Sequence, residues 1–148
     1  MNVVDIYVDG SCSDRKGGWA VYCEYNGKTL EVSGCSDDTT NNLMELKAVV
    51  MAIKSIKLGK FIYNIHTDSR YVLLSIANKD KYRVKEFKKV ANVEALKWFY
   101  SFLESYGISG LSSSLPSGGV INFVKVEGHS GVRGNEIADR MAKEARSV

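Results

Sequence analysis

The hydrophobic pattern of this chain changes partway along, and the change limits the folds it can adopt. The first third has the pattern of three strands, over residues 3–8, 19–25 and 29–35. Asn26-Gly27, between the second and third, is a strong signal for a two-residue hairpin turn. Single strands alternate with helices thereafter. We therefore predict an α/β fold with one five-stranded mixed sheet, antiparallel at one edge, parallel elsewhere and flanked by helices.

Helical periodicity begins after residues 39–42, which offer several N-capping side chains, and it continues to a stop near Gly59. A strand over 61–66 and a short helix carrying Val72, Leu73 and Ile76 follow. The later segments are a basic stretch over 78–89, a helix over 93–106, a Gly/Ser-rich loop over 107–119, a strand over 120–126 and a helix over 135–146.

Length and composition indicate one folded domain spanning residues 1–148. The chain is 45% hydrophobic and 25% charged, with a net charge of +3, which by itself says little about partners. Its 3 cysteines lack metal-binding spacing and are expected to be free thiols in the cytoplasm. We expect no membrane insertion, since no apolar run approaches the roughly 20 residues of a membrane span.

Two aspartates occupy equivalent positions. Asp9 and Asp68 each end a hydrophobic strand and precede a small polar residue. An ordinary role in a turn or helix cap would explain either aspartate alone. If the two strands are parallel neighbours, however, both carboxylates lie at the sheet edge where α/β proteins bind ligands.

Two further acids and a histidine are candidates for the same site. Glu45 lies near the start of its helix, at the border of the apolar face, where a favourable interaction with the helix end is an alternative explanation. Asp139 lies off the apolar face of the last helix and could be a solvated acid. His129 lies in a loop between Gly128 and Gly131, and its chemistry suits proton transfer.

Carboxylates gathered at one edge repel one another unless cations neutralise them. An all-oxygen ligand set favours Mg²⁺, with Mn²⁺ as a substitute, over Zn²⁺. Two such ions can support in-line phosphodiester displacement. This chemistry fits a nuclease.

Four segments in order resemble the type 1 ribonuclease H (ribonuclease HI) family. They are Val8-Asp9-Gly10-Ser11-Cys12, residues 39–46 around Asn41-Asn42 and Glu45, Thr67-Asp68-Ser69-Arg70, and residues 126–139 from Val126 to Asp139. The resemblance implies the ribonuclease H-like fold and a two-metal endonuclease that cuts the RNA strand of RNA–DNA hybrids. The products would carry 5′-phosphate and 3′-hydroxyl ends.

The resemblance also implies roles for individual residues. The catalytic, metal-binding acids would be Asp9, Glu45, Asp68 and Asp139, and His129 would assist proton transfer or product departure. Residues expected to bind the hybrid are Gly10, Ser11, Cys12, Thr40, Asn41, Asn42, Arg70, Lys81, Arg83, Lys85, Lys88, Lys89 and Asn135. Contacts to sugar and phosphate would make binding salt-sensitive and weakly dependent on sequence.

Residues 79–89 form what we call the basic segment, with six cations, two acids and interleaved Tyr82 and Phe87. It corresponds to the basic handle with which many family members grip the hybrid, although a solvated helix face has a similar composition. We expect the protein to be a monomer.

Three alternatives remain open at this stage. A DNA nuclease or resolvase of the same superfold would share the acids without selecting for RNA. A non-catalytic hybrid-binding module is a second alternative, but it would be expected to lack at least one acid. The chain could also be a domain of a reverse transcriptase.

Overall fold

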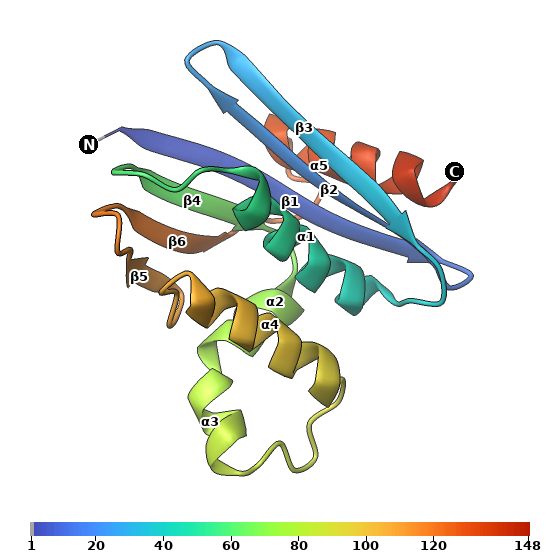
Figure 1. Ribbon diagram of the computed structural model, residues 1–148. Coiled ribbons are helices and arrows are strands. Elements are labelled where there is room, and N and C mark those ends of the chain that lie inside the picture. The colour runs from blue at the N-terminus through green and yellow to red at the C-terminus, as the bar shows by residue number, and fades with distance from the viewer. Residues whose placement is uncertain (1) are drawn as a thin grey trace.

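The computed structural model describes residues 2–148 and is built on one sheet (Figure 1). Its elements, in chain order, are β1 (Val3–Ser13), β2 (Lys16–Tyr25), β3 (Lys28–Ser36), α1 (Asn41–Ser55), β4 (Ile62–Thr67), α2 (Arg70–Ala77), α3 (Lys79–Val84), α4 (Val93–Ser105), β5 (Ser112–Ser114), β6 (Val120–Lys125) and α5 (Arg133–Arg146). None of the helices within residues 2–148 combines the length and apolarity needed to cross a membrane.

The predicted α/β class and mixed sheet are confirmed, but the predicted strand number was wrong. The sheet has 6 strands in the order β3-β2-β1-β4-β6-β5, antiparallel through β1–β3 and parallel across β1, β4 and β6. The additional strand, β5, pairs antiparallel with β6 inside the predicted 107–119 loop. Three consecutive serines carry no hydrophobic alternation, so only pairing to the edge of β6 makes them a strand.

β1 is also longer than predicted. We expected a strand over residues 3–8, but the antiparallel pairing of β1 with β2 continues to Ser13, opposite Lys16. Its parallel pairing with β4 stops earlier, at Tyr7 opposite His66. Beyond Tyr7, β1 therefore has a neighbour on one side only, and the other side is open at Asp9.

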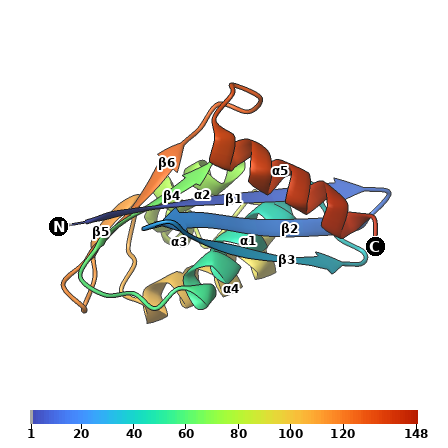
Figure 2. The same cartoon turned by 90° about the horizontal axis from the view of Figure 1, so that it is seen from above.

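Helices cover both faces of the sheet, with α1 and α4 on one and α5 on the other (Figure 2). Close approach of α5 requires glycine, since a Cβ on Gly18 would lie 2.1 Å from the Ala142 carbonyl oxygen. In turn, a Cβ on Gly134 of α5 would lie 2.3 Å from the Tyr7 ring. The start of α5 is thereby seated against the middle of β1.

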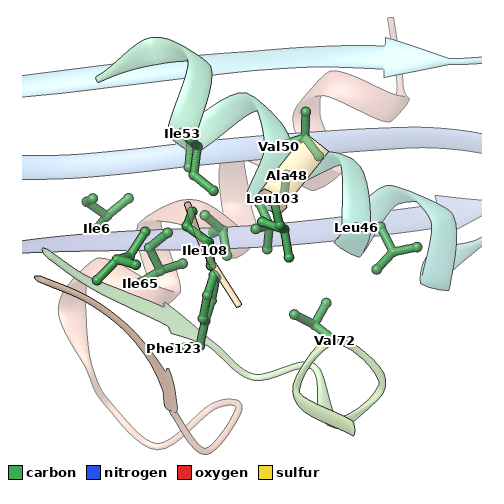
Figure 3. Packing of buried hydrophobic residues seen from close by; sticks show 14 of the residues in the cluster. Ile6, Leu46, Ala48, Val50, Ile53, Ile65, Val72, Leu103, Ile108 and Phe123 are labelled. Carbon is green, nitrogen blue, oxygen red and sulfur yellow. The ribbon is translucent and has the colours of Figure 1, made fainter. Parts of the chain in front are cut away.

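The main hydrophobic core lies between the sheet and the α1/α4 layer (Figure 3). Ile6 and Ile65 project from adjacent strands toward Ile53 of α1 and Leu103 of α4. Residues of the predicted α1 stripe such as Leu46, Val49 and Ile53 are at most 2% exposed, which accounts for the position of this helix on the sheet.

Candidate active site

Asp9 and Asp68 occupy matching positions on neighbouring parallel strands. Each lies two residues beyond the last paired residues of β1 and β4, Tyr7 and His66. Asp68 does not cap the following helix: the Ser69 hydroxyl does so by accepting the Val72 amide at 3.1 Å. The expected juxtaposition at the sheet edge is observed, because the two carboxylates lie within one group of oxygens.

Glu45 reaches these aspartates because α1 lies unusually close to β1. A Cβ on Gly10 would be 2.4 Å from the Glu45 backbone nitrogen, so glycine is required at the crossing. The Gly10 amide donates a hydrogen bond to the Glu45 carboxylate. Thr40, as predicted from the capping residues, caps α1 by accepting the Leu43 amide at 3.2 Å. The short Asp9-Gly10 sequence thus supplies both a candidate metal ligand, Asp9, and the space that lets Glu45 approach it.

The three carboxylates form a compact, largely buried group. One oxygen from each of Asp9, Glu45 and Asp68 lies within 4.8 Å of the others. Burial, followed by the charges of Glu45, Asp68 and Asp139, raises the pKa of Asp9. Burial and the charge of Asp68 raise the pKa of Glu45. The cluster therefore resists holding its full negative charge without a cation, and its all-oxygen donors fit Mg²⁺ or Mn²⁺.

Asp139 approaches the cluster from the opposite face of the sheet. It contributes to the raised pKa of Asp9 by a side-chain hydrogen bond and by its charge. The Lys143 ammonium lies 3.1 Å from the Asp139 carboxylate, one helical turn away. Sequence reasoning missed Lys143, although an (i, i+4) pairing to a candidate acid could have identified it.

His129 lies on the exposed loop that joins β6 to α5. Its backbone is left-handed, with φ of 56°, and Gly131 on the same loop has φ of 85°. A Cβ on Gly128 would contact an Asp68 carboxylate oxygen at 3.4 Å, so the loop begins beside the cluster. The loop ends where Arg133 donates a hydrogen bond to Glu24 on β2 at 2.9 Å.

Several predicted hybrid-binding residues lie within a few positions of Asp9, Glu45 or Asp68 along the chain, but their side chains differ in exposure. Thr40, Asn41, Asn42 and Arg70 are exposed, and Gly10 and Cys12 are half-buried. Buried Ser11, in contrast, accepts a hydrogen bond from Arg146. The Cys12 thiol donates to the Thr39 carbonyl at 3.4 Å.

Asn135 lies one helical turn before Asp139 and is 2% exposed. Its side-chain oxygen Oδ1 is buried and has no hydrogen-bond partner among residues 2–148. An unsatisfied buried amide is costly, which makes this position a candidate for a polar ligand or an ordered water.

The basic segment begins with α3 and projects away from the sheet (Figure 1). Lys81, Lys88 and Lys89 are exposed, while the Lys85 ammonium lies 5.6 Å from the centre of the Tyr82 ring. Arg83, which we expect to bind the hybrid, donates two hydrogen bonds to Glu104 of α4. Glu104 lies 21 residues further along the chain, and no local pattern predicts that pairing.

Comparison with known proteins agrees with this architecture. The RNase H family model matches residues 1–147. A ribonuclease H from Campylobacter concisus is 38% identical over 97% of this chain and 92% of its own. The crystal structure of LC9-RNase H1 is similar, with a TM-score of 0.75 and 25% sequence identity over 99% of this chain and 73% of that one. LC9-RNase H1 is described as a type 1 RNase H with the type 2 active-site motif.

The fold is also shared by LC11-RNase H1, crystallised in complex with an RNA/DNA hybrid. That structure has a TM-score of 0.61 and 18% identity, covering 97% of this chain and 96% of its own. The family match over nearly the whole sequence and the carboxylate group at the open edge of β1 lead to one conclusion. The chain belongs to the ribonuclease H family.

Proposed function

We propose that this protein hydrolyses the RNA strand of RNA–DNA hybrids, leaving 5′-phosphate and 3′-hydroxyl ends. The observation that carries the proposal is the group formed by Asp9, Glu45 and Asp68, whose oxygens lie within 4.8 Å of one another in a ribonuclease H fold. The hybrid bound by LC11-RNase H1, which shares this fold, supports the same substrate class.

The metal ligands we propose are Asp9, Glu45, Asp68 and Asp139. The raised pKa of Asp9, caused first by burial and then by neighbouring acids, indicates that a bound cation would relieve a repulsion already present. Two Mg²⁺ ions, replaceable by Mn²⁺, would supply an activated water and stabilise charge on the leaving oxygen.

The remaining roles belong to side chains at the rim of the cluster. The His129 imidazole, carried on an exposed loop beside Asp68, would take up or deliver a proton near the leaving group. Lys143, 3.1 Å from Asp139, would hold that carboxylate in place.

Selection for RNA would come from polar groups that bind the 2′-hydroxyl, which both donates and accepts hydrogen bonds. Asn41 and Asn42 are exposed at the start of α1, four and three residues from Glu45, and are suitably placed. The exposed lysines of the basic segment would contact phosphates and make binding salt-sensitive.

A cleavage assay on an end-labelled hybrid tests the proposal. We expect RNA-strand cutting in Mg²⁺ or Mn²⁺, none in EDTA, and none of duplex DNA or duplex RNA. Asp9→Asn should abolish cutting, whereas Asp37→Asn, the same change at an exposed acid, should not. Binding without cutting in either metal would favour a non-catalytic module, and equal cutting of duplex DNA would favour a DNA nuclease.

A monomeric, cytoplasmic protein consisting of a single domain over residues 1–148 is part of the same proposal and rests on the sequence. Light scattering of the purified protein tests the monomer: a mass near 16.4 kDa is expected, and a mass near twice that value contradicts it.

A further inference from the structure

Beside the packing of Phe87 against Tyr100 and Lys97, one carboxylate of α4, Glu104, binds two cations of the basic segment. Glu104 accepts hydrogen bonds from both terminal nitrogens of Arg83, at 2.6 and 2.8 Å, and from the Lys79 ammonium at 3.3 Å. Lys79 is only 7% exposed, so its charge depends on this partner. Hydrogen bonding from Arg83 is the main cause that lowers the pKa of Glu104 to about 2, and Glu104 therefore stays ionised at neutral pH.

A second layer of contacts connects this carboxylate to the helix that follows Asp68. The Arg83 guanidinium lies 5.7 Å from the centre of the Tyr100 ring. Buried Tyr100 donates a hydrogen bond to the Ser75 carbonyl of α2 at 2.5 Å. Since α2 begins at Arg70, immediately after Asp68 and Ser69, the contacts join the basic segment to the helix that follows one carboxylate of the cluster.

The basic segment cannot hold this position by local forces alone. α3 has 6 residues, too short for a helix to be stable in isolation. The turn that follows contains left-handed backbone at Glu86, Phe87 and Lys89. Six cations concentrated over 79–89 also repel one another. The position of the basic segment therefore depends on tertiary contacts. Among the charged contacts, the Glu104 carboxylate makes the largest number.

We propose that Glu104 is a positioning residue for substrate binding: by clamping Lys79 and Arg83 it orients α3, so that Lys81, Lys85, Lys88 and Lys89 face the hybrid. Lys79 and Arg83 then act as structural cations rather than as phosphate contacts. This inference rests on the proposed function, because it assigns to the basic segment the grip on an RNA–DNA hybrid.

The proposal predicts that removing the Glu104 charge changes the affinity for the hybrid in the direction opposite to the one expected from charge alone. Glu104→Gln removes a negative charge beside a surface that binds a polyanion, which by charge alone should tighten binding. If Glu104 positions the lysines, the same substitution should weaken binding instead. Glu86→Gln is the matched control, since Glu86 is an exposed acid of the basic segment that makes no ion pair within residues 2–148.

Steady-state cleavage of a short hybrid, with KM and kcat measured separately, is the experiment. For Glu104→Gln we expect KM to rise about three- to tenfold, kcat to stay within about twofold, and the salt dependence of binding to become shallower as phosphate contacts are lost. Glu86→Gln should leave KM unchanged or lower it. Glu104→Asp, which keeps the charge, should recover part of the loss.

Two further measurements separate positioning from other roles. Amide hydrogen exchange over residues 79–92 should be faster in Glu104→Gln, while the exchange of β1 and β4 amides should be unchanged. The KM increases of Arg83→Gln and Glu104→Gln should not add in the double variant if both act through one clamp. Additive increases would show that Arg83 contacts the hybrid directly and would overturn the proposal.

The outcomes also distinguish this inference from the proposed function. If the unaltered protein cleaves the hybrid and Glu104→Gln has an equal or lower KM, the positioning role is wrong and the function stands. If the unaltered protein neither binds nor cleaves the hybrid, the proposed function fails, and the positioning role fails with it.

Discussion

Replacing Asp9 with Asn should stabilise the metal-free protein while abolishing its activity. Asp9 is 4% exposed, and burial together with Glu45, Asp68 and Asp139 raises its pKa from an ordinary value of 3.8. A carboxyl that stays protonated in the folded state but ionises on unfolding makes folding less favourable as pH rises. The amide of Asn cannot ionise and escapes this cost.

The size of the effect follows from the pH at which it is measured. The cost is absent below about pH 4 and grows by about 1.4 kcal/mol per pH unit above it, giving a ceiling of about 4 kcal/mol at pH 7. Water penetration and local rearrangement reduce this ceiling, so we expect Asp9→Asn to gain about 1–3 kcal/mol. That gain corresponds to roughly 3–9 °C in Tm for a domain of this size.

Thermal unfolding in EDTA, followed by circular dichroism from pH 4 to pH 8, measures the gain. The difference in Tm between Asp9→Asn and the unaltered protein should be near zero at pH 4 and largest at pH 8. Asp37→Asn, an exposed acid, should show no such trend. Saturating Mg²⁺ should raise the Tm of the unaltered protein and reduce the difference, because metal binds the folded cluster. A gain that does not depend on pH, or a loss of stability at pH 7, would refute the reasoning.

Three other perturbations test separate parts of the structure. Gly10→Ala places a Cβ 2.4 Å from the Glu45 backbone and should cost about 2–4 kcal/mol in urea unfolding, whereas Gly110→Ala, with nothing within 4 Å, should be close to neutral. The pKa of Glu104 is lowered to about 2, so its stabilising contribution is complete above about pH 4.5 and is lost as pH falls toward 2. Over that range the unaltered protein should therefore lose more stability than Glu104→Gln. Equal losses in the two proteins would contradict the pairing of Glu104 with Arg83 and Lys79. Arg133→Gln removes the hydrogen bond to Glu24, so amide hydrogen exchange at residues 127–132 should become about two- to fivefold faster. The free energy of unfolding should change by less than about 1 kcal/mol. Arg140→Gln, whose partner Glu144 lies on the same helix, should leave exchange in that loop unchanged.

The element order and part of the site could be predicted from local patterns. Alternating apolar residues and Asn26-Gly27 identified the hairpin of β2 and β3, and the capping residues located the start of α1. The matching positions of Asp9 and Asp68 after two strands predicted their proximity. Such features depend on neighbours only a few residues apart, which a sequence displays directly.

Glu45 and Asp139 were less certain from their own surroundings, and it was the ordered set of motifs that singled them out. On a helical wheel each could be an ordinary acid at the edge of an apolar face. The structure shows why they meet Asp9: α1 crosses β1 at Gly10, where a side chain would collide with the Glu45 backbone, and α5 is seated against Tyr7 by Gly134. A glycine is visible in the sequence, but the backbone that approaches it is not.

Tertiary structure alone decided where the remaining groups lie. β5 is a strand because β6 offers an unpaired edge, β1 extends to Ser13 because β2 continues to pair with it, and Arg83 meets Glu104 across two helices. Local periodicity fixes which elements form, since it reflects 3.6-residue and two-residue repeats within a segment. Contacts between distant segments depend instead on how packed elements cross, and crossing geometry is set by the complete core.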